Sequence, residues 1–128
     1  MVVDTSALLC VLFVEPDSQR FSNILSRSRD TLLCAVNYFE GVVVAGSRSG
    51  DRGRAIFLEI LANAGISIVP ATAELSRIAT DAYFRFGKGF HPARLNMGDC
   101  FAYALARQLN QPLLFKGNDF ARTDIEAA

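Results

Sequence analysis

The sequence predicts a single α/β domain in which a short parallel sheet is covered by helices on both faces. Apolar runs of about four or five residues alternate with longer stretches of helical periodicity. Strands in such an alternation usually pair in parallel, with helices packed on both sides. Hydrophobic residues make up 51% of the 128 positions, and no linker rich in Pro, Gly or Ser divides them, so residues 1–128 are expected to form one domain.

The chain begins with the pattern of a buried strand that turns directly into a helix. Residues 2–3 are the strand and Asp4 ends it. Thr5 or Ser6 is the expected N-cap of a helix over residues 7–14. An acidic side chain at the carboxyl end of a strand lies where open α/β sheets bind their ligands.

Turn and cap residues divide the rest of the chain into three more strands and several helices. Pro16 suits the first turn of a second helix, Gly65 suits a helix C-terminus, and Thr72 suits an N-cap. The expected strands cover residues 31–35, 66–69 and 112–115, and the expected later helices cover residues 36–49, 54–64, 73–86 and 97–109. Residues 87–94 are the one long irregular stretch.

The charge balance limits the function classes only mildly. Lys and Arg number 13, as do Asp and Glu, so the formal net charge is zero. Nucleic-acid binders are often strongly basic, which counts against tight non-specific binding. The charge balance does not exclude a nuclease, because a bound metal ion and a local arginine patch can supply the positive potential that a nucleic acid requires.

Cysteine usage and hydropathy indicate a cytoplasmic protein without membrane contact. Cys10, Cys34 and Cys100 lie in apolar segments without a CxxC pair, which favours free buried thiols in a reducing compartment. The apolar runs fall short of the about 20 residues that cross a bilayer. The first residues also lack the basic leader of a signal peptide.

Four acids have similar settings although they lie far apart in the sequence. Asp4 ends the first strand, Glu40 and Asp99 lie near the starts of two helices, and Asp119 follows the last strand. The carboxyl ends of parallel strands, and the N-termini of the helices after them, share one edge of the sheet. We therefore expect these acids to meet in one crevice.

Such a cluster predicts a divalent metal site. Neighbouring carboxylates repel one another, and a cation removes that cost. Mg²⁺ and Mn²⁺ prefer carboxylate and water oxygens, and a single histidine makes a zinc site unattractive. Metal-activated water and charge neutralisation at phosphate then indicate a phosphodiesterase with one or two ions.

Each acid also has a structural interpretation. Asp4 could cap a helix, and Asp99 could stabilise a helix N-terminus, although the small Gly98 beside Asp99 leaves room for a ligand. Glu40 has apolar neighbours that favour a partly buried place. Asp119 is the weakest candidate, because Gly-Asn-Asp is also an ordinary turn. Asn118 or Asp124 could take its place.

Together the motifs resemble the PIN domain family and, within it, the VapC-type ribonuclease toxins of bacterial toxin–antitoxin pairs. The resemblance covers nearly the whole chain, and its matching stretches are VDTSAL at 3–8, YFE at 38–40, LNMGDCFAYALA at 95–106 and LLFKGNDFARTDI at 113–125. The third stretch is the most specific. The chain departs from the family pattern after the last strand, where Lys116 and Gly117 stand in place of a Thr or Ser followed by an acid.

The resemblance implies a PIN-like three-layer α/β/α sandwich with a short parallel sheet of four or five strands. It implies Mg²⁺- or Mn²⁺-dependent cleavage of RNA, a homodimer, and a small VapB-like antitoxin that covers the acidic site. Asp4 and Asp99 would be the main metal ligands, with Glu40 as a third acid and Asp119 as an uncertain fourth. Thr5 or Ser6 would be a polar neighbour that supports the site.

Basic residues around the irregular stretch are candidates for RNA contact. Arg85, Lys88 and Arg94 could bind phosphate, or they could belong to a solvated loop. His91 is a tempting general base, but a lone histidine in a Gly/Pro loop is more often incidental, and metal-bound hydroxide needs no such base.

Three other functions compete with a toxin ribonuclease. A housekeeping RNA-processing PIN nuclease fits less well because the chain is compact. An aspartate-nucleophile phosphatase usually has a second Asp two residues after the first, where Ser6 stands here. A non-catalytic, receiver-like metal-binding module needs a phosphoacceptor Asp with a Lys opposite, and Lys116 keeps that interpretation open.

Overall fold

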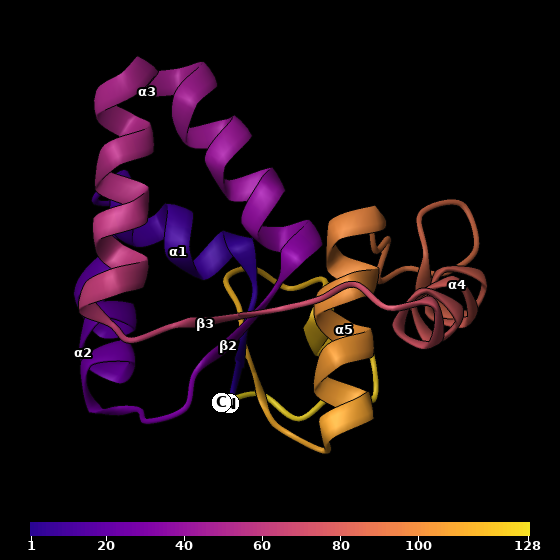
Figure 1. Cartoon of the computed structure of the whole chain (residues 1–128). Coiled ribbons are helices and arrows are strands. Elements are labelled where there is room, and N and C mark those ends of the chain that lie inside the picture. Colours follow the sequence, from indigo (N-terminus) through magenta and orange to yellow (C-terminus); the bar gives the residue numbers. More distant parts are fainter.

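A computed structural model describes all 128 residues, and it confirms the alternation of strands and helices (Figure 1). No helix in it combines the length and apolar character needed to cross a membrane. The elements in chain order are β1 (Val2–Val3), α1 (Thr5–Leu12), α2 (Ser18–Arg27), β2 (Leu32–Cys34), α3 (Ala35–Asn63), β3 (Ser67–Val69), α4 (Ala73–Phe86), α5 (Met97–Leu109), β4 (Leu113–Leu114) and the 3₁₀ turn η1 (Phe120–Arg122).

The sheet has four parallel strands in the order β3-β2-β1-β4. Val2 pairs with Leu32 on one side and with Leu113 on the other, so β1 is a central strand. The carboxyl end of β1 therefore lies in the middle of one sheet edge. Residues 126–128 lie beside β4 and run parallel to it, with the amide of Leu113 bonded to the carbonyl of Glu126 at 2.9 Å.

Helices cover both faces of the sheet, as the three-layer expectation requires. Alternate strand residues point to opposite faces and enter two separate hydrophobic cores. The core beneath α1, α2 and α3 takes Val3, Leu33 and Leu114, and the core beneath α4 and α5 takes Val2, Cys34 and Leu113. Figure 1 shows the two helical layers on either side of the strands. All three cysteines are buried and free, as expected.

Helix α3 is two arms joined by a bend, at the place where the sequence predicts a break. Ser49 and Gly50 leave the helical conformation, and Gly50 adopts a positive φ of 60°. The two arms meet at this bend and diverge away from it (Figure 1). Gly41 on the first arm lies so close to the buried ring of Phe57 that a Cβ at position 41 would come within 2.2 Å of it. Close packing of the arms thus depends on the missing side chain.

Substitution Gly41→Ala is expected to destabilise the fold, because the added methyl group overlaps the fully buried Phe57 ring. Overpacking of this kind lowers the free energy of unfolding by about 1–3 kcal/mol. Urea unfolding measures the difference.

Gly46→Ala is the matched control on the same helix. Its new Cβ meets only the side chain of Arg54, which is exposed and can move, so stability is unchanged or rises by up to about 1 kcal/mol. Equal losses in both variants would contradict the assignment of the constraint to Phe57.

Candidate active site

The structure brings the four acids together at the carboxyl edge of the sheet. Asp4 follows β1, Glu40 lies in the second turn of α3, Asp99 in the first turn of α5, and Asp119 at the start of η1. Their charges influence one another: Asp4, Glu40 and Asp119 all raise the pKa of Asp99. Glu40 is in turn affected by Asp4, and Asp4 by Asp119. The four acids therefore lie within electrostatic range of neighbours at this edge, although no three of them are close enough to hold one ion directly.

Asp4 is 3% exposed and is itself the N-cap of α1. Its Oδ2 accepts hydrogen bonds from the amide of Ser6 at 2.9 Å and from the hydroxyl of Ser6 at 2.5 Å. The expectation that Thr5 or Ser6 caps this helix is wrong, because both residues already have helical backbones and the Thr5 side chain turns toward α3. Burial raises the pKa of Asp4, and the bonds from Ser6 oppose that shift.

Glu40 is held between α1 and α5. Its Oε2 accepts from the hydroxyl of Thr5 at 3.0 Å, and a Cβ at position 98 would lie 2.4 Å from the same oxygen. Gly98 therefore makes room for the Glu40 carboxylate, where the sequence suggested room for a ligand. Burial raises the pKa of Glu40, and the charge of Asp4 adds to the effect.

Asp99 serves both the helix and the acid cluster. Asn96 and Asp99 form a capping box: the Asn96 side chain accepts from the Asp99 amide, and Asp99 Oδ2 accepts from the Asn96 amide, each at 2.9 Å. Burial, followed by the charge of Asp4, raises the pKa of Asp99 to about 7. An acid used only as a cap lacks this repulsion from neighbouring carboxylates.

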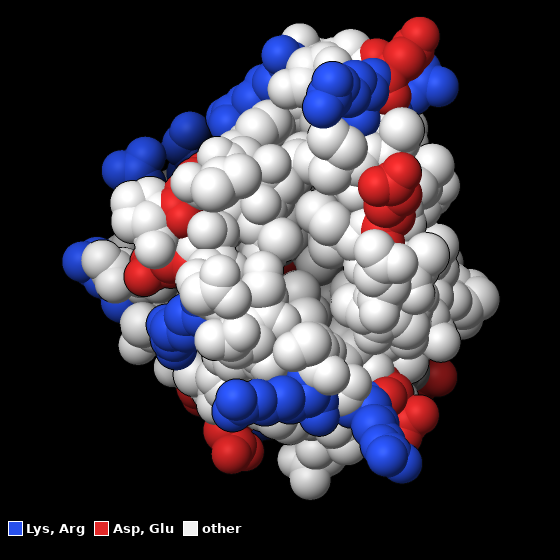
Figure 2. Space-filling model, turned by 90° about the vertical axis from the view of Figure 1, so that its left-hand side faces the viewer, with Lys and Arg blue, Asp and Glu red and all other residues white.

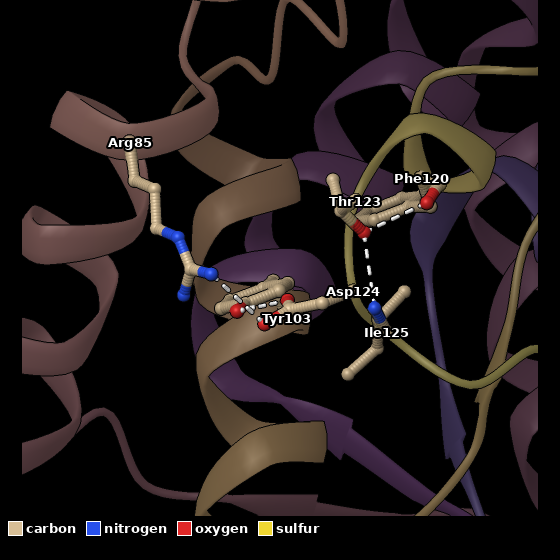
Figure 3. A network of polar contacts seen from close by, with 6 residues as sticks. All are labelled: Arg85, Tyr103, Phe120, Thr123, Asp124 and Ile125. Carbon is tan, nitrogen blue, oxygen red and sulfur yellow. Dashed lines mark hydrogen bonds and ion pairs between the residues drawn. The ribbon is translucent and has the colours of Figure 1, made fainter.

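Asp119, and not Asp124, acts electrostatically on Asp4 and Asp99. Asp119 is exposed, its side chain makes no capping bond, and its charge reaches Asp4 and Asp99. Asp124 instead accepts a 2.6 Å bond from the Tyr103 hydroxyl and pairs with Arg85 at 3.3 Å (Figure 3). These partners lower the pKa of Asp124, which does not act on the acid cluster.

Asn37 is a buried part of the site that the sequence interpretation missed. It is 0% exposed in the first turn of α3, and its Nδ2 lies 3.3 Å from Asp4 Oδ1 and 3.1 Å from the carbonyl oxygen of Gly98. The available signal was its spacing, since Asn37 precedes Glu40 by three residues and therefore shares its helix face.

Of the three basic residues proposed to contact RNA, one is bound to other side chains and two form no ion pair. Arg85 is engaged with Asp124 and stacks on the ring of Phe86 at 4.7 Å. Lys88 and Arg94 are exposed and form no ion pair. His91 has a structural role, because its Nδ1 accepts from the amide of Ala93 at 3.0 Å.

Lys116 does not fit the receiver-like alternative. Its ammonium group pairs with Glu15, not with Asp4. Its backbone amide donates to the Ser6 hydroxyl at 3.0 Å, so Lys116 supports the site through the main chain.

Surface charge forms no single basic face on the side of α2 and α3. Lys and Arg lie along the margins there, around a largely uncharged middle (Figure 2). On this face, therefore, positive charge for a polyanion comes only from a few separate side chains.

The donor set of the acid cluster fits a hard divalent cation. No three Asp, Glu, His or Cys side chains are close enough to hold one ion directly. Mg²⁺ nevertheless commonly binds through one or two carboxylates and keeps several waters. Asp99 Oδ1 and Glu40 Oε1 have no hydrogen-bond partner. Burial, and after it the charge of neighbouring acids, raises the pKa of both side chains, and a cation would offset that neighbouring charge.

Comparisons with known proteins agree with this geometry. The PIN domain family matches residues 1–126. Ribonuclease VapC30 of Mycobacterium tuberculosis is 42% identical over 125 residues, which cover 98% of this chain and 95% of the relative. Ribonuclease VapC of Mycolicibacterium smegmatis is 41% identical over 127 residues, which cover 99% and 98%.

Solved structures share the fold at much lower identity. The crystal structure of Mycobacterium tuberculosis VapC20, described as a Sarcin-Ricin loop cleaving toxin, matches with a TM-score of 0.80 at 16% identity and covers 99% of this chain and 97% of its own. A toxin–antitoxin complex from Klebsiella pneumoniae matches with a TM-score of 0.69 at 13% identity, covering 96% and 92%. By family match and by identity over its whole length, the chain belongs to the PIN domain family, as one of its VapC ribonucleases.

Proposed function

We propose that this VapC ribonuclease is the toxin of a toxin–antitoxin pair and that it cuts RNA internally by Mg²⁺- or Mn²⁺-dependent hydrolysis. The observation that carries the proposal is the placement of four acids at the carboxyl edge of the sheet, where burial and neighbouring acidic charge raise the pKa values of Asp4, Glu40 and Asp99. A divalent ion bound there supplies an activated water and stabilises negative charge at the scissile phosphate.

The proposed ligands are Asp4 and Asp99, with Glu40 as a third acid and Asp119 at the exposed rim. Ser6 holds Asp4 by two hydrogen bonds, and Thr5 holds Glu40 by one. These bonds fix carboxylate orientation before substrate arrives, which reduces reorganisation in the reaction.

Lys88 and Arg94 are the proposed RNA-backbone contacts, because both are exposed and neither is neutralised by an ion pair. Arg85 is a poorer candidate for that role, since RNA would have to compete with Asp124 for its guanidinium group.

A small VapB-like antitoxin, a second copy of the chain, and a cytoplasmic location complete the proposal. Exposed apolar side chains offer surfaces for protein partners: Phe39 and Val43 on α3 are 68% and 46% exposed, and Phe84 and Phe90 near the end of α4 are 63% and 58% exposed. The Klebsiella neighbour, a toxin–antitoxin complex by description, supports the kind of partner proposed.

Substitution Asp99→Asn is expected to reduce RNA cleavage by at least about 100-fold while the fold survives, because the asparagine keeps the capping geometry and removes the ligand charge. Cleavage of total RNA with Mg²⁺ or Mn²⁺, and with EDTA as a blank, measures the loss. Asp124→Asn is the matched control, since that carboxylate lies outside the cluster, and it should retain activity. Full activity in Asp99→Asn would refute the ligand assignment.

Asp119→Ala is expected to lose less activity than Asp4→Ala. Asp119 is exposed and holds nothing in place, whereas Asp4 is buried and receives bonds from two elements. Initial cleavage rates over a range of Mn²⁺ concentrations compare the two variants. Equal losses at saturating Mn²⁺ would make Asp119 a direct ligand.

The unfolding free energy of the metal-free protein should fall as the pH rises from the unfolded-state pKa of Asp99 to its folded-state pKa. Its pKa goes from 3.8 in the unfolded chain to about 7 in the folded protein, so the folded state binds more protons and loses stability between about pH 4 and pH 7. The full shift corresponds to about 4 kcal/mol, which solvent screening reduces.

Asp99→Asn should therefore raise the metal-free unfolding free energy at pH 8 by roughly 1–3 kcal/mol and abolish most of the stabilisation by added Mn²⁺. Urea unfolding at pH 5 and pH 8, with EDTA or Mn²⁺, tests both effects. A variant that is less stable than the parent at pH 8 in EDTA would contradict the repulsion.

A further inference from the structure

The side-chain amide of Asn37 joins three parts of the site at its buried base. Its Nδ2 lies 3.3 Å from Asp4 Oδ1, 3.3 Å from the Thr5 hydroxyl and 3.1 Å from the carbonyl oxygen of Gly98. These partners lie at the end of β1, the start of α1 and the start of α5. One side chain on α3 thus links that helix to the end of β1, the start of α1 and the start of α5.

The chemistry of the partners fixes the orientation of the amide. The carboxylate of Asp4 and the carbonyl of Gly98 can only accept hydrogen bonds, so the NH₂ group must face them. The oxygen of the same amide faces no donor: Asn37 Oδ1 is buried and has no hydrogen-bond partner. A buried acceptor without a partner costs stability. Stability alone therefore does not account for an asparagine at this position.

We infer that Asn37 is a positioning residue that sets the relative placement of Asp4 and Asp99 before the ion binds. The inference rests on the proposed metal-dependent function. Asp4 and Asp99 are both carboxylates at the same sheet edge, and two ionised carboxylates repel each other. Asn37 opposes that separation, because it binds Asp4 directly and binds the carbonyl of Gly98, the residue before Asp99.

Loss of this amide should weaken metal binding more than it weakens the fold. Without it, Asp4 Oδ1 loses the hydrogen bond from α3, and the N-terminus of α5 loses its bond to the same side chain. The ion itself then has to bring Asp4 and Asp99 together. The free energy needed for this reduces the net binding free energy of the ion, so its Kd rises. Groups that orient metal ligands typically change metal affinity by about 10–100-fold when they are removed.

The test compares Mn²⁺ affinity with metal-free stability in the full chain. Asn37→Leu removes all polar contacts at similar volume, and Asn37→Ser is the second variant in case leucine prevents folding. Thr31→Val is the matched control, since Thr31 is also 0% exposed with an unpartnered hydroxyl but lies at the start of β2, at the opposite end of the strand. Titration of Mn²⁺ followed by electron paramagnetic resonance gives Kd, and urea unfolding in EDTA gives stability.

The expected result is a Kd for Mn²⁺ at least about tenfold higher in the Asn37 variants and unchanged in Thr31→Val. In RNA cleavage at fixed Mn²⁺, kcat should fall while KM for RNA stays the same. An Asn37 variant that loses stability in EDTA but keeps the parent's Kd would overturn the inference and leave the nuclease proposal standing. A parent chain that binds no Mn²⁺ would overturn both.

Discussion

The central constraint of this molecule is the burial of the Asp4 carboxylate at the end of a central strand. Placing a carboxylate in the interior is unfavourable unless donors surround it. Here the donors are the amide and hydroxyl of Ser6 and the side chain of Asn37. The first turn of α1, the first turn of α3 and, through Gly98, the first turn of α5 are thus arranged around one acidic group. The rest of the site follows from this arrangement.

Small residues allow the surrounding elements to approach this closely. Gly98 lies against the Glu40 carboxylate, and Gly41 lies against the ring of Phe57. The first contact brings α5 to α3, and the second folds the two arms of α3 together. The bend that starts at Ser49 places Phe57 in the core beneath the first arm. The acid cluster therefore depends on packing that begins some distance from it.

The sequence predicts the elements well and their mutual contacts poorly. Strand–helix alternation, the cap at Thr72 and the helix from Met97 to Leu109 follow from local patterns, and the structure confirms them. The choice of Asp4 over Thr5 as the cap depends on the turn of the Thr5 side chain toward α3, which no local pattern records.

The site residues show the same contrast: local patterns predict some of them, and tertiary contacts decide the others. The placement of Asp4, Glu40, Asp99 and Asp119 at one sheet edge could be predicted from their positions relative to strands and helices, because parallel topology makes such positions converge. Asn37 and the exclusion of Asp124 could not. The first depends on a contact between α3 and α5, and the second on a hydroxyl of α5 that reaches the C-terminal segment. Both are tertiary contacts that are distant in sequence.

The return of the C-terminal residues along β4 makes the two edges of the sheet unequal. Leu113 is hydrogen-bonded to Glu126 and Ala128, so the backbone of β4 is already paired on its outer side. The opposite edge is β3, which pairs only with β2 and exposes 48% of Ile68. An unpaired edge strand is where a foreign strand can extend a sheet. The edge strand open to a foreign strand is therefore β3, while residues 126–128 occupy the outer side of β4.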